Sequence, residues 1–214
     1  MALVVGTNCG FVTTAPTTNP SESGWTADYR STVSKYTSPV NAVKITEIGW
    51  YCFNATPAAN TQIGVYESDG TDGEPYTLLG TSGDFAKGTG AGWKVATGLN
   101  ITISPETDYW LAVQCDNTTP TSYISSKSSV TQEHRADTYT TSLLSPWGTT
   151  AENYSTLRIG IYAVYETAAT GTNLQLNIGD DWKEISAAQI NIGDVWKEVA
   201  GIQINIGDTW KEVF

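Results

Sequence analysis

The sequence predicts an all-β protein, in which an antiparallel, jelly-roll-like β-sandwich is followed by a small β-meander or prism of three 14-residue hairpin repeats. Three observations support this fold class. Short runs rich in β-branched and aromatic residues alternate apolar with polar positions, turn residues separate these runs, and no segment keeps a helical period over several turns. With 214 residues, of which 40% are hydrophobic, the chain can form one core and a small appendage.

The first predicted strands lie in residues 41–55, 61–68 and 92–105. In residues 41–55 the apolar alternation changes phase near Glu47, so we expect a β-bulge or a bend between sheets at that point. Residues 61–68 form a short apolar run, which the turn-rich stretch DGTDGEP closes. The run in residues 92–105 carries regularly placed Val, Leu and Ile side chains and reads as a further strand.

Two later runs show the clearest alternation. Residues 107–117 place one set of side chains on one face, namely Tyr109, Leu111, Val113 and Cys115, and Trp110, Ala112 and Gln114 on the other. Residues 155–166 place Leu157, Ile159, Ile161, Ala163 and Tyr165 on a single face. The long connections, residues 68–92 and 116–154, are more typical of a jelly roll than of a simple meander. The second connection is rich in Ser and Thr, and short irregular strands are expected there at Ser122–Ser126 and Thr138–Thr141.

The C-terminal part repeats one phrase three times, with Ile178, Ile192 and Ile206 at equivalent positions. In each unit a Gly-Asp pair separates two alternating runs, which predicts a β-hairpin. A two-residue loop would place Asn177 opposite Trp182, and a three-residue loop would place Ile178 opposite Trp182. We favour the three-residue loop, because it puts Ile and Trp on one apolar face. The predicted domains are a sandwich in residues 1–166, a linker in residues 167–172 and the repeat module in residues 173–214.

Composition excludes several classes of function. The net charge is −11, and such a surface repels phosphate backbones and anionic membranes, so we expect neither a nucleic-acid nor a membrane partner. The opening MALVVGTNCGFV lacks the basic and long apolar regions of a secretory signal peptide. The exposed, Thr- and Ser-rich texture is nevertheless that of an extracellular protein. Release by cell lysis as part of a virus particle reconciles the two observations and predicts a location on the virion surface.

Catalytic chemistry is not expected. The only histidine, His134, lies in a polar stretch without the Gly-x-Ser-x-Gly elbow of a serine hydrolase. Carboxylates that could serve glycoside hydrolysis lack a recognisable context: Asp69, Asp72, Glu74, Glu106 and Asp108. Cys52 and Cys115 fall in strand-like runs and read as small buried apolar residues, with a disulfide between them as the alternative.

Two kinds of binding site remain as candidates. The stretch ESDGTDGE places hard oxygen ligands in a Gly-rich loop, as calcium prefers: Glu67, Asp69, Asp72 and Glu74. The alternative is an ordinary solvated turn, and no cofactor is expected apart from this candidate calcium ion. Exposed tryptophans could stack on sugar rings, and the candidates are Trp182, Trp196 and Trp210 in the repeats and Trp50 and Trp110 in the sandwich. The alternative is that the repeat tryptophans lie in a core or an interface and that the sandwich tryptophans pack in the core.

The run that contains IGVYES and the later YWLAVQ resembles a jelly-roll domain type common in secreted and virion-associated proteins. The opening residues and the NIGDxWKEV ending resemble uncharacterised structural proteins of tailed phages. This resemblance implies a non-enzymatic virion structural protein: a head decoration, a head fibre or a tail-associated part. Its partners would be copies of itself, with a trimer expected, other virion proteins, and cell-surface or environmental glycans. The alternative is a carbohydrate-binding module or adhesin that uses the exposed tryptophans.

Overall fold

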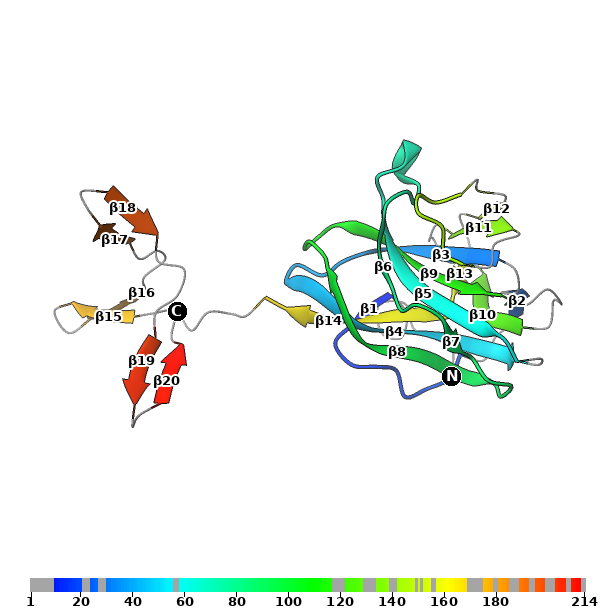
Figure 1. Ribbon diagram of the computed structural model, residues 1–214, viewed down its shortest axis with the longest axis horizontal. Coiled ribbons are helices and arrows are strands. Elements are labelled where there is room, and N and C mark those ends of the chain that lie inside the picture. The colour runs from blue at the N-terminus through cyan, green and yellow to red at the C-terminus, as the bar shows by residue number, and fades with distance from the viewer. Residues whose placement is uncertain are drawn as a thin grey trace. The chain divides into compact units, whose positions relative to one another are not determined.

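The computed structural model divides the chain into two units, Met1–Thr167 and Ala168–Phe214 (Figure 1). It describes residues 10–20, 24–26, 30–55, 58–116, 122–128, 134–138, 142–148, 150, 152–154 and 157–167 of the first unit. Of the second unit it describes residue 168 and the strands 175–178, 181–184, 189–192, 195–198, 203–206 and 209–212. The last strand of the first unit reaches Thr167, one residue beyond the end that the sequence predicts for the sandwich.

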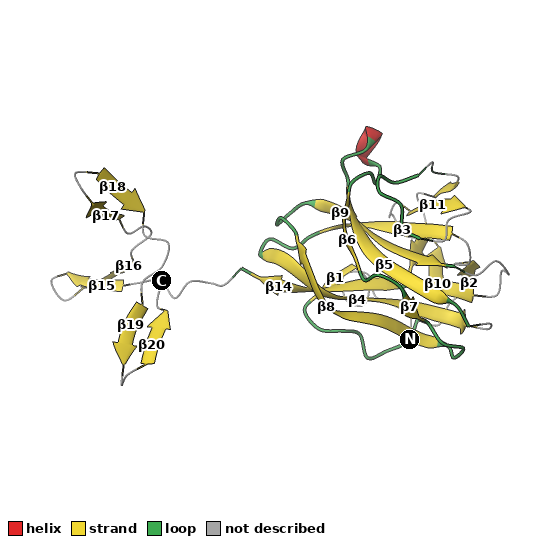
Figure 2. Ribbon diagram, viewed as in Figure 1, coloured by secondary structure: helices red, strands yellow, loops and turns green. Residues whose placement is uncertain are grey.

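The first unit consists of two sheets (Figure 2). The first sheet has the order β1 (Gly10–Val12), β14 (Ile161–Thr167), β4 (Ala42–Ala55), β10 (Ser122–Ser128) and β13 (Leu157–Ile159), with β2 (Gly24–Thr26) on β10 and β8 (Gly92–Thr102) on β4. The second has the order β12 (Glu152–Tyr154), β11 (His134–Thr138), β3 (Arg30–Thr37), β9 (Asp108–Cys115), β5 (Asn60–Glu67) and β6 (Leu78–Thr81), with β7 (Phe85–Ala86) on β5.

Every strand pair in these sheets is antiparallel except β1 with β14. The helical structure of the described residues is limited to the 3-10 turn η1 (Thr71–Gly73). The prediction of an all-β, sandwich-like protein is therefore confirmed. Of the two irregular strands expected in the long connection, the first coincides with β10. The second overlaps β11 at Thr138, and its remaining residues, 139–141, lie outside the described residues.

The main core lies between the two sheets. It contains Trp50 and Cys52 from β4, Ile161 from β14, and Leu111 and Val113 from β9. The alternation predicted for residues 107–117 is confirmed, since Tyr109, Leu111, Val113 and Cys115 all belong to this core. Cys52 and Cys115 both have 0% of their surface exposed and belong to this core, which confirms their interpretation as small buried apolar residues.

The phase change in β4 is a β-bulge. Glu47 lies opposite Val164 and Ile45 lies opposite Tyr165 on β14, so Thr46 is the extra residue on β4. Ile45 and Ile48 are three positions apart, so a regular strand would place them on opposite faces. The bulge lets both side chains reach the core. The prediction of a bulge near Glu47 is confirmed.

The outer face of the second sheet is also covered. Val33, Tyr66, Trp110 and Ala112 form a second apolar cluster beneath Leu143 and Trp147. The rings of Tyr66 and Trp147 meet edge to face, with 5.2 Å between their centroids. The Tyr66 hydroxyl donates to the Leu144 carbonyl at 2.5 Å, and the Trp147 backbone N–H donates to the Tyr76 carbonyl at 2.9 Å. The segment of residues 142–148 is thus fixed as a cover over β3, β5 and β9.

The second unit contains three hairpins, β15 (Gln175–Ile178) with β16 (Asp181–Glu184), β17 (Gln189–Ile192) with β18 (Val195–Glu198), and β19 (Gln203–Ile206) with β20 (Thr209–Glu212). In the described strands each hairpin forms its own two-stranded sheet, so the predicted continuous meander is not what the strands form. A physical reason lies in the Lys-Glu pair on the second strand of every hairpin, because charged residues on an edge strand oppose further pairing.

The loop length in the hairpins differs from the one favoured above. Asn177 lies opposite Trp182 and Ile178 opposite Asp181, and the other two hairpins have the same register. Two residues therefore separate the paired strands, and the preference for a three-residue loop was wrong. Gly followed by a polar residue is a sequence that two-residue hairpin loops prefer. This local preference outweighs the gain from placing Ile and Trp on one face.

Candidate functional site

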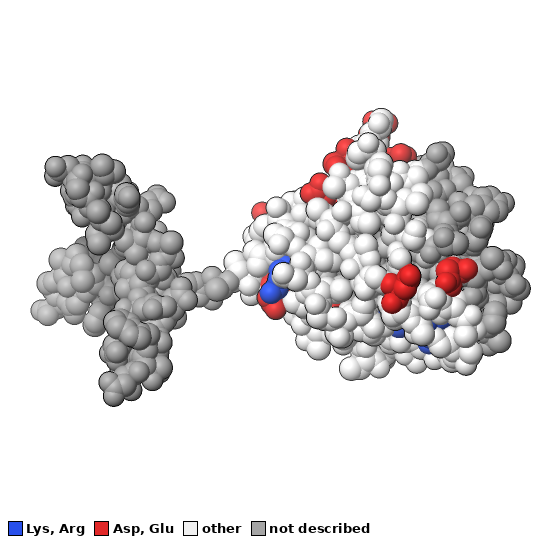
Figure 3. Space-filling model, viewed as in Figure 1, with Lys and Arg blue, Asp and Glu red and all other residues white. Residues whose placement is uncertain are grey.

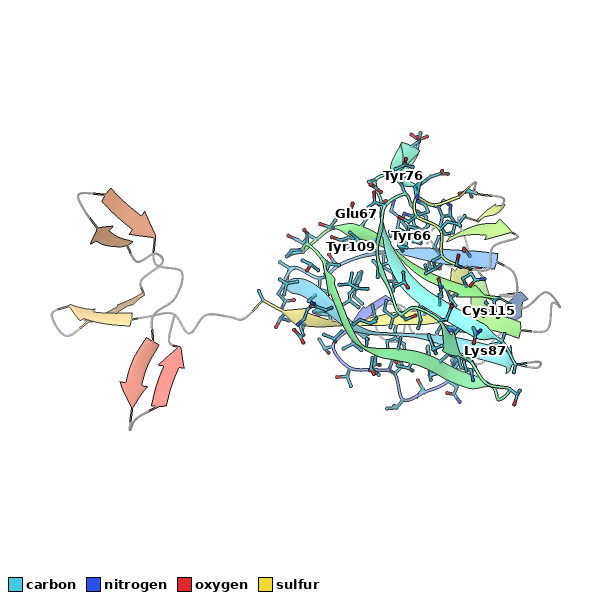
Figure 4. The ribbon with its side chains drawn as sticks, viewed as in Figure 1. Tyr66, Glu67, Tyr76, Lys87, Tyr109 and Cys115 are labelled. Carbon is cyan, nitrogen blue, oxygen red and sulfur yellow. The ribbon has the colours of Figure 1, made fainter. Side chains whose placement is uncertain are left out.

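A depression of about 660 Å³ opens at one end of the first unit. Its lining comes from β3, β5, the connection after β5, the turn before β9 and the start of β9: Lys35, Glu67, Ser68, Asp69, Gly73, Glu106, Thr107, Asp108 and Tyr109. The strand register explains this gathering, because Tyr109 on β9 lies opposite Tyr36 on β3 and opposite Glu67 on β5. Figure 4 shows Glu67 and Tyr109 on this end, and Figure 3 shows acidic side chains there. The depression combines carboxylates with a single cation, Lys35.

The Gly73 carbonyl is a hydrogen-bond acceptor for several side chains in and beside the depression. It accepts hydrogen bonds from the Ser68 hydroxyl at 2.5 Å, the Trp110 indole N–H at 3.1 Å and the Lys35 ammonium at 3.3 Å. Lys35 Nζ also lies 3.7 Å from Asp108 Oδ2 and 5.4 Å from the centroid of the Trp110 ring. The cation of the depression is thus already engaged by a carboxylate, a carbonyl and an aromatic face.

Asp69 stabilises the connection between β5 and β6 through hydrogen bonds to Thr77. Its two carboxylate oxygens accept from the Thr77 backbone N–H at 2.9 Å and from the Thr77 hydroxyl at 2.5 Å. Burial raises the pKa of the Asp69 carboxyl, but the hydrogen bonds from Thr77 outweigh this effect and lower the pKa below its ordinary value of 3.8. Asp69 therefore acts within the fold as an ionised acceptor that closes the loop between β5 and β6.

The four residues predicted to bind calcium separate in the structure. Glu67 and Asp69 line the depression, whereas Asp72 and Glu74 do not. Asp72 lies in η1 with a positive φ of 55°. Within the described part of the chain, which includes all four residues, no three Asp, Glu, His or Cys side chains gather closely enough to hold a metal ion. The structure does not bring these carboxylates together as a calcium site.

The two tryptophans proposed for sugar stacking in the sandwich are inaccessible. Trp50 and Trp110 each have 0% of their surface exposed. Trp50 points into the core between the sheets, and Trp110 lies under the segment of residues 142–148. Neither ring can stack on a sugar in this structure, and both rings pack in apolar clusters, as the alternative interpretation of these two residues expected. The alternation placed Trp110 on the outer face of β9 correctly, but a distant segment covers that face.

The three tryptophans of the repeats lie at equivalent positions in the hairpins. Residues that are directly opposed in an antiparallel pair lie on the same face. Asn177 therefore shares a face with Trp182, and Gln175 and Glu184 are the next opposed pair on that face. Trp196 is opposed by Asn191 and Trp210 by Asn205 in the same way. Each tryptophan is thus placed among amide and carboxylate residues rather than among the isoleucines.

Sequence reasoning missed the polar neighbours of these tryptophans. It assigned Asn177 and Trp182 to different faces, because it favoured the longer loop. The Gly-Asp pair was the signal that could have corrected this choice, since it is typical of two-residue loops. Lys35 and its place in the depression were also missed, because the contacts of Lys35 come from residues far away in the sequence.

Comparison with protein-family models, with curated proteins and with solved structures finds no match for this chain. In the parts of the chain that are described, no helix has the length and apolar character needed to cross a membrane.

Proposed function

We propose that the chain is a non-enzymatic structural protein of a tailed-phage particle, in which the β-sandwich is displayed on the surface and the repeat unit assembles or attaches it. The observation that carries the proposal is the architecture of the repeat unit. Three hairpins with one register follow a sandwich that has a complete core of its own.

A two-stranded hairpin is marginally stable in water, so each repeat needs a surface to cover it. One face of every hairpin is rich in apolar positions, such as Leu176 and Ile178 in the first hairpin and Ile190 and Ile192 in the second. Burying each such side chain contributes about 1.5–3 kcal/mol. Several equivalent apolar faces can be covered together when copies of the chain associate, and we expect a trimer.

The finer description of the sandwich as jelly-roll-like is part of this proposal. Successive long strands alternate between the sheets: β3 lies in the second sheet, β4 in the first, β5 in the second, β8 in the first and β9 in the second. The alternation continues with β10 in the first sheet and β11 in the second, and it supports a jelly-roll-like topology. Because such sandwiches serve many functions, the proposal for the particle rests on the repeats and on the sequence resemblance and not on the sandwich alone.

The location can be tested on particles from a culture that produces the chain. Antibodies raised against residues 1–167 would be used for immunoblots of a density gradient and for immunogold electron microscopy. We expect the protein to sediment with the particles and gold to decorate their surface, with preimmune serum as the control. Protein that stays in the soluble fractions and leaves the particles unlabelled would contradict the proposal.

A further inference from the structure

One face of every hairpin carries the same four residues. The observed register places the Gln and Glu of each repeat opposite one another and the Asn opposite the Trp. We call this set the amide–tryptophan face. Its members are Gln175, Asn177, Trp182 and Glu184; Gln189, Asn191, Trp196 and Glu198; and Gln203, Asn205, Trp210 and Glu212.

The residues on the opposite face are not all identical in the three hairpins. Position 181 is Asp in the first hairpin, and the equivalent positions are Val195 and Thr209. This position precedes the tryptophan directly in the sequence, so a change of charge and polarity is accepted next to an unchanged tryptophan. The three repeats are therefore not identical at every position. The four residues of the amide–tryptophan face are identical in all three hairpins, and we attribute this to a function that the three faces share.

Solubility alone does not explain why these four residues are the same in every hairpin. A tryptophan buries roughly 150–250 Å² when it is covered, and the residues that share its face in the register are all polar. A solvated face would be served by any small polar residue. A face on which the register places a tryptophan with two amide residues and a glutamate is instead suited to a ligand that has both an apolar surface and many hydroxyl groups. Amides both donate and accept hydrogen bonds, and a carboxylate accepts them.

We propose that the amide–tryptophan face of each hairpin binds a neutral saccharide, with the tryptophan stacking on a sugar ring and the Asn, Gln and Glu hydrogen-bonding to its hydroxyls. Each chain then has three equivalent saccharide sites. The inference goes beyond the structural role proposed above and does not depend on it, since saccharide binding can be measured whether or not the protein belongs to a particle.

The charges on the two faces select the class of ligand. The lysines of the repeats, Lys183, Lys197 and Lys211, fall on the opposite face, so the amide–tryptophan face has a carboxylate and no cation. Phosphate, sulfate and uronic acid groups would be repelled by this carboxylate and by the net charge of −11. A four-residue face is also far smaller than the roughly 20–30 residues that each partner contributes to a standard protein interface.

Three sites in one chain predict binding that depends on the density of the glycan. A surface that displays many copies engages several hairpins at once, and this can strengthen binding by a factor on the order of 10²–10⁴ over a single site. A free oligosaccharide should therefore bind weakly, and a polysaccharide or a dense array should bind tightly.

The test uses the full chain on an array of neutral oligosaccharides built from glucose, galactose or mannose units, with polygalacturonate as the acidic comparison. Binding to neutral glycans is expected, and binding to polygalacturonate is not. The triple variant Trp182→Ala, Trp196→Ala, Trp210→Ala should lose the signal, and a single substitution should lower the apparent affinity about tenfold because one of the linked sites is lost.

The matched control changes the opposite face of the same hairpins. The triple variant Lys183→Ala, Lys197→Ala, Lys211→Ala should bind neutral glycans as the unchanged chain does. If circular dichroism shows that the tryptophan variant has lost its hairpins, the triple variant Asn177→Ala, Asn191→Ala, Asn205→Ala takes its place and should lose binding with the strands intact. A full chain that binds no neutral glycan would overturn the proposal, as would a signal that both the tryptophan and the asparagine variants retain.

Discussion

At the scale of single residues, the outer face of the first sheet holds a tight aromatic cluster around Tyr162. The Tyr162 ring lies over Gly49, where an added Cβ would come within 2.4 Å of the ring, and it meets the Trp93 ring edge to face at 5.0 Å. Its hydroxyl donates to Glu47 Oε1 at 2.6 Å. Burial raises the pKa of the Tyr162 phenol well above its ordinary value of 10.0, and the hydrogen bond and negative charge of Glu47 raise it further.

This pKa shift predicts an effect of alkaline pH on stability. A group whose pKa is raised by folding stabilises the fold fully below its unfolded pKa, near 10, and loses that contribution as the pH rises further. We expect Tyr162→Phe to lower the free energy of unfolding by about 1.5 kcal/mol at pH 7, because a hydrogen bond to a charged group is lost. The difference from the unchanged chain should shrink above pH 10.

Urea unfolding at pH 7, 9 and 11 would measure this difference. Tyr76→Phe is the matched control, since 51% of the Tyr76 side chain is exposed, and it should change stability little at any of these values. A difference between Tyr162→Phe and the unchanged chain that is absent at pH 7, or that grows between pH 9 and pH 11, would contradict the assignment.

Residue faces could be predicted from the sequence better than residue exposure. The alternation in residues 107–117 gave the right faces for Trp110 and Leu111, since one lies in the outer cluster and the other in the core. The accessibility of Trp110 could not be predicted in this way. It depends on Trp147 and Leu143, which cover the outer face from a segment that has no strand pattern.

At the scale of elements, the segment of residues 142–148 is held by side-chain packing and not by strand pairing. Trp147 is 7% exposed and packs against Tyr66, and its indole N–H donates to the Thr150 hydroxyl at 3.1 Å. Because Trp147 is a large side chain buried in the second apolar cluster, we expect Trp147→Ala to lower the free energy of unfolding by about 3 kcal/mol. It should also uncover the Trp110 ring.

Acrylamide quenching of tryptophan fluorescence and thermal unfolding would measure the two effects. The comparison is Leu144→Ala in the same segment, where 37% of the side chain is exposed and a change of no more than about 0.5 kcal/mol is expected. Equal stability of the two variants would show that the segment does not act as a cover.

Also at this scale, the hairpins show which part of an element a sequence pattern determines. The repeat of Ile, Gly-Asp and Trp was enough to predict three hairpins and their positions. It left the loop length open, and one residue of loop decides whether Trp182 shares a face with Ile178 or with Asn177. The choice on grounds of core packing failed because a lone two-stranded hairpin has no core of its own, so the local preference of the loop decides the register.

At the scale of the whole molecule, the two units differ in how they can be stable. The first has a core between its sheets and a second cluster on an outer face, so it has what a domain needs to fold by itself. The hairpins of the second unit have one apolar face and one amide–tryptophan face each. If the apolar faces are covered by association and the other faces bind saccharides, assembly and ligand binding use opposite sides of the same strands and do not compete.

The solution mass of the full chain and of residues 1–167 tests this division between the units. We expect light scattering after gel filtration to give a trimer for the full chain and a monomer for residues 1–167, because the apolar faces that need cover all belong to the repeats. The pair Ile192→Ser and Ile206→Ser should shift the full chain toward monomer, whereas the alanine substitutions at the three lysines on the same faces should leave the mass unchanged. If the full chain is itself monomeric at every concentration, the three hairpins cover their apolar faces within one chain and the assembly role is wrong. The saccharide sites would then act as three per monomer, with an avidity set by one chain alone.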